Sequence, residues 1–119
     1  MEWSIQEIAR KAGEKGDRWW RSLSAAEQQE FKDRQVAIAR DYGQAARAGL
    51  AADSDEVQAI TRRHYEWLSI TTKPTKEYLV GLGQMYVDDP RFTKNYDRHG
   101  EGTAVLVRDA MAVFAERNL

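Results

Sequence analysis

Residues 82–97 read LGQMYVDDPRFTKNYD, and this stretch decides the fold. Apolar and aromatic side chains recur at helical spacing from just before this stretch into its first half: Tyr78, Leu82, Met85 and Tyr86. This spacing places them on one face of a helix. Pro90 is expected to end or kink that helix near Asp88 and Asp89, because residues before a proline avoid the α region. Pro90 also suits the first turn of a new short helix, with Asp88 or Asp89 as its N-cap. The stretch therefore predicts two helices that meet at a corner.

The corner is rich in aromatic side chains. Phe92 and Tyr96 are four residues apart after Pro90, so they share one face of the second helix. Aromatic residues at helical spacing usually build a core, whereas tyrosine and tryptophan also suit binding clefts. A fully buried tyrosine hydroxyl needs a hydrogen-bond partner, which favours a cleft position for some of the tyrosines. We expect about half of the aromatic set to be core and half to be pocket wall.

Capping signals and apolar periodicity predict helices along the rest of the chain. Capping boxes are expected from Ser4 with Glu7 and from Ser24 with Glu27. The helices are predicted over 1–13, 25–48, 55–71 and 76–87, from Pro90 to near Gly100, and over 103–117. No strand pattern competes with them. The expected fold class is all-α, with five to six helices in globin-like or helical-bundle packing.

The segment between the first two helices is predicted to be a linker. Residues 14–20 are charged, contain a glycine and run into Trp19 and Trp20. Neighbouring residues on a helix point in different directions, so at most one of the two tryptophans is expected to reach the core. The other is expected to be exposed, to contact a partner or to lie over a ligand.

Composition bounds the class of protein. The chain has 119 residues, 42% of them hydrophobic, a formal net charge of −1 and no cysteine. This length fits one domain with its own core, and the charge provides no strong field for nucleic acid or acidic membranes. The absence of cysteine excludes disulfides, thiolate metal sites and a thiol nucleophile. No apolar run reaches the length of a membrane span, so a cytoplasmic location is expected.

The stretch 82–97 resembles the signature of the TipAS-type antibiotic-recognition domain, the ligand-binding module of some MerR-type transcription regulators. The segment HYEWLS at 64–69 is similar to the family's His-x-x-Trp-apolar-Ser pattern, and the likeness continues to Arg108-Asp109-Ala110. It covers residues 19–118. The resemblance implies an all-helical, globin-like fold that binds bulky peptide-like antibiotics, of which thiopeptides are the known type.

Residues 1–13 resemble the first helix of a MerR-type DNA-binding domain, but the turn, recognition helix and wing of that domain do not follow. The alternative is a coincidental capped helix. The expected organisation is a short N-terminal helix and linker at 1–18, as a remnant or shortened form of that domain, and an antibiotic-recognition domain at 19–119. DNA binding is not expected for this chain.

The resemblance and the aromatic corner together predict a ligand-binding cleft. Its expected residues are His64, Trp67, Tyr78, Gly81, Gln84, Met85, Tyr86, Phe92 and Tyr96. Some members of the family carry a cysteine at the position of Gly81 and use it to capture dehydroalanine groups covalently. Because this chain has no thiol, any binding is expected to be reversible. Gly81 is expected either to deepen a pocket or to admit a neighbouring helix.

Nothing in the sequence indicates an enzyme, a metal site or a cofactor. His64 and His99 without cysteine make a poor zinc set. His64 is expected either to be a buried residue bonded to a backbone carbonyl or to face the cleft beside Trp67. The acidic pairs Asp53/Asp55 and Asp88/Asp89 stand at helix starts, where capping explains them.

Two functions are therefore predicted from different classes. The first is noncovalent sensing or sequestration of a bulky, amide-rich antibiotic. The alternative is a helical interaction module that forms a homodimer or docks on another protein through an exposed apolar face that includes Trp19 or Trp20.

Overall fold

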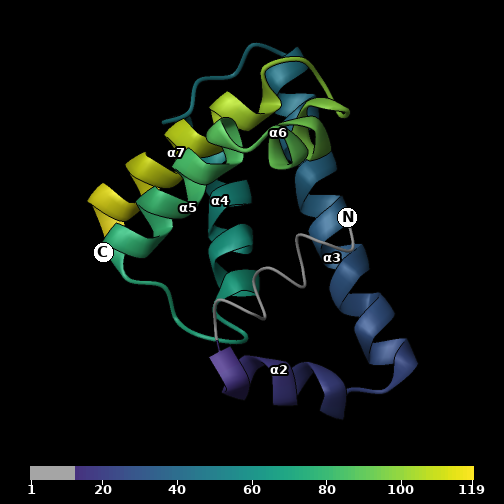
Figure 1. The fold of residues 1–119 in the computed structure, drawn as a ribbon. Helices are drawn as coiled ribbons and strands as arrows, with labels where there is room; N and C mark the ends of the chain where they lie inside the picture. Colours follow the sequence, from purple (N-terminus) through teal and green to yellow (C-terminus); the bar gives the residue numbers. More distant parts are fainter. Residues whose placement is uncertain (1–12) are drawn as a thin grey trace.

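The computed structural model describes residues 13–119, so the first helix expected at 1–13 lies almost wholly outside the described part. The described chain forms six helices (Figure 1): α2 (Gly13–Ser22), α3 (Ala25–Arg47), α4 (Asp55–Leu68), α5 (Lys76–Asp88), α6 (Pro90–Asp97) and α7 (Thr103–Asn118). Between residues 13 and 119 there is no strand. The predicted all-α fold class is confirmed.

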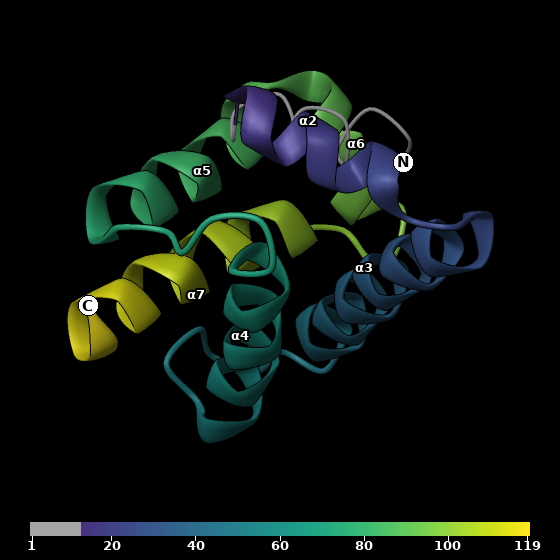
Figure 2. The same cartoon turned by 90° about the horizontal axis from the view of Figure 1, so that it is seen from below.

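Helices α5 and α7 form an antiparallel pair that lies side by side in both views (Figures 1 and 2). The start of α5 is joined to the end of α7 by an ion pair, with Lys76 Nζ 2.9 Å from Glu116 Oε2. The helices approach closely at Gly83, where an added Cβ would lie 3.2 Å from the Cα of Arg108. Helices α3, α4 and α6 close the core around this pair, and α2 is joined to the start of α3 by a short connection (Figure 2).

The helix ends are set by local capping. Ser24 and Glu27 exchange the two hydrogen bonds of the predicted capping box, at 2.9 and 3.1 Å. At the other end of α3, Gly49 has a φ of 71° and the N–H of Leu50 donates to the carbonyl of Ala45 at 3.0 Å. That bond belongs to a Schellman motif, whose left-handed position favours glycine.

Helix α2 corrects one expectation. Residues 14–20 are helical rather than a linker, because α2 runs without a break from Gly13 to Ser22. Glycine inside a helix costs only about 1 kcal/mol, which tertiary packing can outweigh. Trp19 and Trp20 both contact the ring of Phe31, with centroids 5.3 and 5.7 Å away. Both rings are half-buried and pack against the core without belonging to its buried residues, which agrees with the expectation that at most one tryptophan reaches the main core.

Helix α4 ends earlier than expected. Its last residue is Leu68 rather than 71, and Ser69 is its C-cap. The hydroxyl of Ser69 donates to the carbonyl of Tyr65 at 2.7 Å, and the N–H of Ile70 bonds three residues back to Trp67. This tight last turn satisfies carbonyls that a longer helix would have used.

Candidate functional site: a pocket at the corner of α5 and α6

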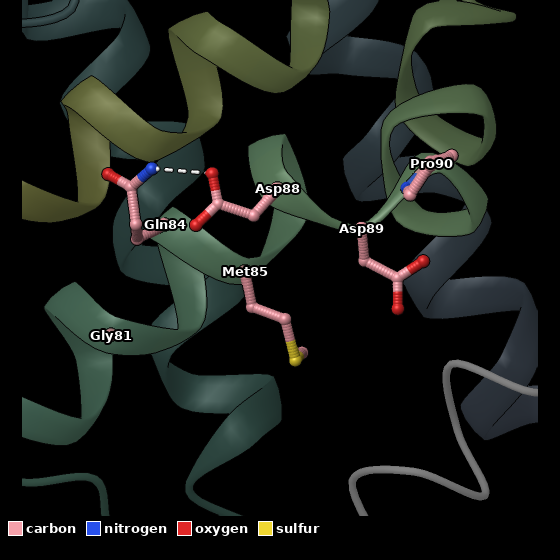
Figure 3. A pocket seen from close by; sticks show the side chains of 6 residues that line it. All are labelled: Gly81, Gln84, Met85, Asp88, Asp89 and Pro90. Atoms are coloured by element: carbon pink, nitrogen blue, oxygen red, sulfur yellow. Dashed lines mark hydrogen bonds between the residues drawn. The ribbon is translucent and has the colours of Figure 1, made fainter.

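The corner between α5 and α6 carries a pocket of about 630 Å³ that is open to solvent (Figure 3). All of its lining residues come from the end of α5 and the start of α6: Gly81, Gln84, Met85, Asp88, Asp89 and Pro90. The pocket is thus built from the stretch that the sequence singles out. Three of its six residues, Gly81, Gln84 and Met85, are among the predicted site residues.

One face of α5 turns towards this pocket. Tyr78, Gly81 and Met85 recur at spacings of three and four residues, so they follow one another along the helix surface. Nothing lies within 4 Å of the place where a Cβ of Gly81 would stand. Of the two readings of Gly81, the described residues favour an open pocket surface over a close helix contact. Backbone rather than side chain forms the wall there.

The rim of the pocket is polar. The amide nitrogen of Gln84 donates to Asp88 Oδ1 at 3.0 Å, one turn along α5 (Figure 3). Asp89 caps α6, accepting from the N–H of Arg91 at 3.0 Å, and pairs with the Arg91 guanidinium at 2.9 Å. Hydrogen bonds from the side chain and backbone of Arg91 hold the pKa of Asp89 below its usual range. The rim therefore presents fixed carboxylate and amide groups.

Three lining residues were not among the predicted site residues: Asp88, Asp89 and Pro90. The sequence explained them as capping groups, and Asp89 is indeed the N-cap of α6. Their spacing from Met85 on a helical wheel would have indicated a position beside the pocket. Asp88 and Asp89 lie three and four residues after Met85, on the same side of the corner. A capping role and a pocket position are compatible.

The other predicted aromatic residues are core. His64, Trp67, Tyr86, Phe92 and Tyr96 are each no more than 2% exposed. Tyr86 of α5 packs on α6, with its ring centroid 5.3 Å from that of Phe92 and 4.9 Å from that of Tyr96. Tyr78, at 38% exposure, is the exception. The expected even division between core and wall is wrong, and direct ligand contact by the five buried residues stays a prediction.

The hydroxyls of Tyr86 and Tyr96 find partners inside the core. Tyr96 forms side-chain hydrogen bonds with Tyr86 and Gln35. Burial raises the pKa of Tyr96 to about 12, and the two hydrogen bonds oppose that rise. Gln35 comes from the long helix α3, far away in sequence, so its role was not visible from local spacing. The need for a hydroxyl partner thus does not place Tyr86 or Tyr96 in a cleft.

His64 is bonded to a side chain rather than to the expected backbone carbonyl. Its Nδ1 lies 3.2 Å from the hydroxyl oxygen of Tyr42. The Tyr42 hydroxyl donates to Thr61 Oγ1 at 3.1 Å, and Thr61 in turn donates to the carbonyl of Val57. Because Tyr42 has one proton, His64 Nδ1–H donates to Tyr42 and Nε2 keeps its lone pair. Burial lowers the pKa of His64 to about 4, so the ring is neutral near pH 7.

Within residues 13–119, no three histidine or acidic side chains gather in a way that would hold a metal ion. No helix of that part is long and apolar enough to cross a membrane.

Comparison with known proteins identifies a family whose model matches most of the chain. The model of the TipAS antibiotic-recognition domain matches residues 6–114. The chain is 36% identical over 88 residues to the HTH-type transcriptional regulator SkgA of Caulobacter vibrioides, covering 72% of this chain and 34% of SkgA. It is 36% identical over 102 residues to the HTH-type transcriptional activator TipA of Streptomyces coelicolor, covering 84% of this chain and 36% of TipA. The chain spans about a third of the length of these relatives.

A solved structure shares the fold. It is TipAS, from a thiopeptide antibiotic multidrug resistance system of Streptomyces lividans, in complex with nosiheptide. The TM-score is 0.76 at 28% identity, and the match covers 98% of this chain and 79% of that one.

Proposed function

The chain belongs to the TipAS antibiotic-recognition domain family, and we propose that it binds bulky, amide-rich antibiotics without forming a covalent bond. The observation that carries the proposal is the position of the pocket. Its lining residues lie between Gly81 and Pro90, and all of them except Gly81 belong to the stretch 82–97 that resembles the family signature. The relative of known structure holds the thiopeptide nosiheptide, which gives the class of ligand.

The chemistry of the pocket supports this ligand class. Met85 and the exposed ring of Tyr78 offer apolar surface on one side of α5. Gln84 and Asp88 offer acceptors and a donor on the next turn, suited to the N–H and C=O groups of a peptide-like molecule. Ligand sites typically combine an apolar wall with a few fixed polar groups. A pocket this open contacts only part of a bulky ligand, so His64, Trp67, Tyr86, Phe92 and Tyr96 contribute by supporting α5 and α6, and directly if the corner opens.

The binding is reversible in this proposal. The chain has no cysteine, and glycine stands at position 81, where some members of the family carry the reactive thiol. Affinity then comes from buried apolar area and hydrogen bonds, reduced by the cost of ordering the partners. The curated relatives are transcription regulators, and a reversible ligand-binding step serves both sensing inside such a regulator and sequestration.

The test is a titration with nosiheptide, followed by amide chemical shifts and by melting temperature. We expect saturable shifts at 81–90 and at Tyr78, and a melting temperature that rises with ligand concentration. Gly81→Trp fills the open pocket surface and should weaken binding at least tenfold. Val80→Trp is the matched control, because Val80 is 40% exposed on the same helix and does not line the pocket.

Unchanged shifts and melting temperature would overturn the proposal, as would equal binding by the two tryptophan variants. The alternative function, an interaction module built on an exposed tryptophan, has less support. Trp19 and Trp20 are both half-buried against Phe31. Concentration-dependent dimerisation, together with amide shifts and a melting temperature that nosiheptide does not change, would favour that alternative.

A further inference from the structure

A cluster of arginines lies at the end of α6, away from the pocket at the start of that helix. Helix α6 packs against α3 (Figure 1), and the contact is tight where its C-terminal turn meets Gly43. A Cβ added to Gly43 would lie 2.4 Å from the Cβ of His99. The backbone of α3 therefore fixes the position of the turn that contains Arg98 and His99.

Two arginines of α3 flank this contact. Arg40 and Arg47 lie three residues before and four residues after Gly43, so both share the helix face that meets the end of α6. Arg47 reaches over the turn, because its Cγ and Nη1 stand 3.1 and 3.4 Å from where a Cβ of Gly100 would be. Arg98 joins them from the end of α6. Three exposed guanidinium groups thus surround one turn.

The three arginines act on the same imidazole. Burial is the largest cause that lowers the pKa of His99, and the charges of Arg98, Arg47 and Arg40 lower it further. No carboxylate is among the charges that act on His99. Asp97 accepts a hydrogen bond from the N–H of Ala104 at 2.9 Å and so caps the following helix. His99 Nε2 is screened from solvent and has no hydrogen-bond partner.

The positive charge of this cluster is local. The whole chain carries a formal net charge of −1, so the cluster is not a consequence of general basicity. Three other arginines of the described part have ion pairs, among them Arg63 with Asp41 at 2.7 Å and Arg91 with Asp89 at 2.9 Å. Arg40, Arg47 and Arg98 have no ion pair with any carboxylate of the described residues. Arginine placed near helix C-termini also offsets the helix dipole, a role that needs no ligand.

We propose that Arg40, Arg47 and Arg98, together with His99, form a second binding site for an oligophosphate group. A guanidinium group can donate two parallel hydrogen bonds to the oxygens of one phosphate, which makes a phosphate the favoured anion. Arg40 and Arg47 are seven residues apart, about 10 Å along the helix axis. One phosphate is small for that span, whereas two or more linked phosphates reach both side chains and Arg98.

Inorganic pyrophosphate is the probe, added to the intact chain at constant ionic strength with acetate as the blank anion. We expect saturable shifts of the His99 ring and of the side-chain N–H groups of the three arginines. The bound anion should also raise the pKa of His99, because it offsets the positive charges that lower it. Arg47→Gln should weaken binding about tenfold, since it removes a charge-assisted contact, and R47Q/R98Q should abolish it.

Arg34→Gln is the matched control, because Arg34 is exposed on the same helix and lies outside the cluster. It should bind pyrophosphate as the parent chain does. The proposal fails if pyrophosphate gives no saturable shift beyond that of acetate, or if R47Q/R98Q and Arg34→Gln bind equally. Arg34, Arg47 and Arg98 are all exposed, so the melting temperatures of these variants should stay close to that of the parent and confirm that they fold.

Discussion

The Nδ1 of His64 lies 3.2 Å from the hydroxyl oxygen of Tyr42, and this contact joins α3 to α4 inside the core. Tyr42 is fully buried and His64 is 1% exposed. The ring of His64 also stacks on Tyr86, with centroids 6.1 Å apart, so it touches the helix that carries the pocket. A neutral imidazole suits this place, because a protonated one would be a buried charge without a carboxylate partner.

The buried His64 predicts a loss of stability in weak acid. Its pKa is about 4 in the folded chain, against 6.5 for the unperturbed side chain. Between these values the unfolded state binds the extra proton, so the free energy of unfolding falls as pH falls from about 6.5 to about 4, and is independent of this group above about pH 7. We expect about 2 kcal/mol less stability near pH 5 than near pH 7.5, measured by urea unfolding.

A variant pair assigns this effect to one residue. His64→Phe should remove most of the pH dependence, whereas His99→Gln should retain it. An NMR titration of the native chain gives a direct check, because the His64 ring should stay neutral until the pH approaches about 4. A ring that titrates near its ordinary value in the folded protein would contradict the prediction.

Two glycines in helices should respond in opposite ways to the same substitution. Gly43→Ala places a methyl group 2.7 Å from the carbonyl oxygen of His99, so the backbone must shift. We expect a loss of about 1–3 kcal/mol in the free energy of unfolding. Gly81→Ala meets nothing within 4 Å and should gain about 0.5–1 kcal/mol from helix propensity. Equal effects in urea unfolding would show that the close contact at Gly43 is not rigid.

Phe31 should hold α2 on the domain. Its ring stacks on Trp67 at 4.5 Å and meets the edges of Trp19 and Trp20. Phe31→Ala should cost about 3–5 kcal/mol, because it leaves a cavity among three indole rings. Phe31→Leu should cost less and leave a folded chain in which the α2 amides exchange hydrogen faster than those of α7. Unchanged exchange in α2 would mean that other contacts hold the helix.

Gly81→Cys should introduce a reactive thiol into the pocket. Open space around position 81 leaves the sulfur accessible to a ligand. With nosiheptide, the thiolate should add to the β-carbon of a dehydroalanine group while a proton goes to the α-carbon. Mass spectrometry should therefore show the protein plus the whole ligand mass. Val80→Cys is exposed outside the pocket and should react with a maleimide but much more slowly with nosiheptide.

Helix boundaries were predictable because local signals set them. The Ser24–Glu27 capping box starts α3 as predicted, and Asp89 with Pro90 starts α6 as predicted. These interactions join residues two or three apart, so sequence spacing contains them. The exceptions are α2 and the end of α4. Long-range packing on Phe31 outweighs the glycines of α2, and a tight turn after Leu68 shortens α4.

The sequence by itself determined the all-helical architecture, the proline corner and the absence of a thiol, since each depends on residue type and local spacing. Only the tertiary structure decided which aromatic residues are core and which face solvent. Tyr78 and Tyr86 share a predicted helix face, yet Tyr78 is 38% exposed and Tyr86 is 2% exposed. The difference arises because α4 and α6 cover Tyr86. A periodic pattern gives the direction of a side chain along one helix, but burial depends on which other helix lies opposite.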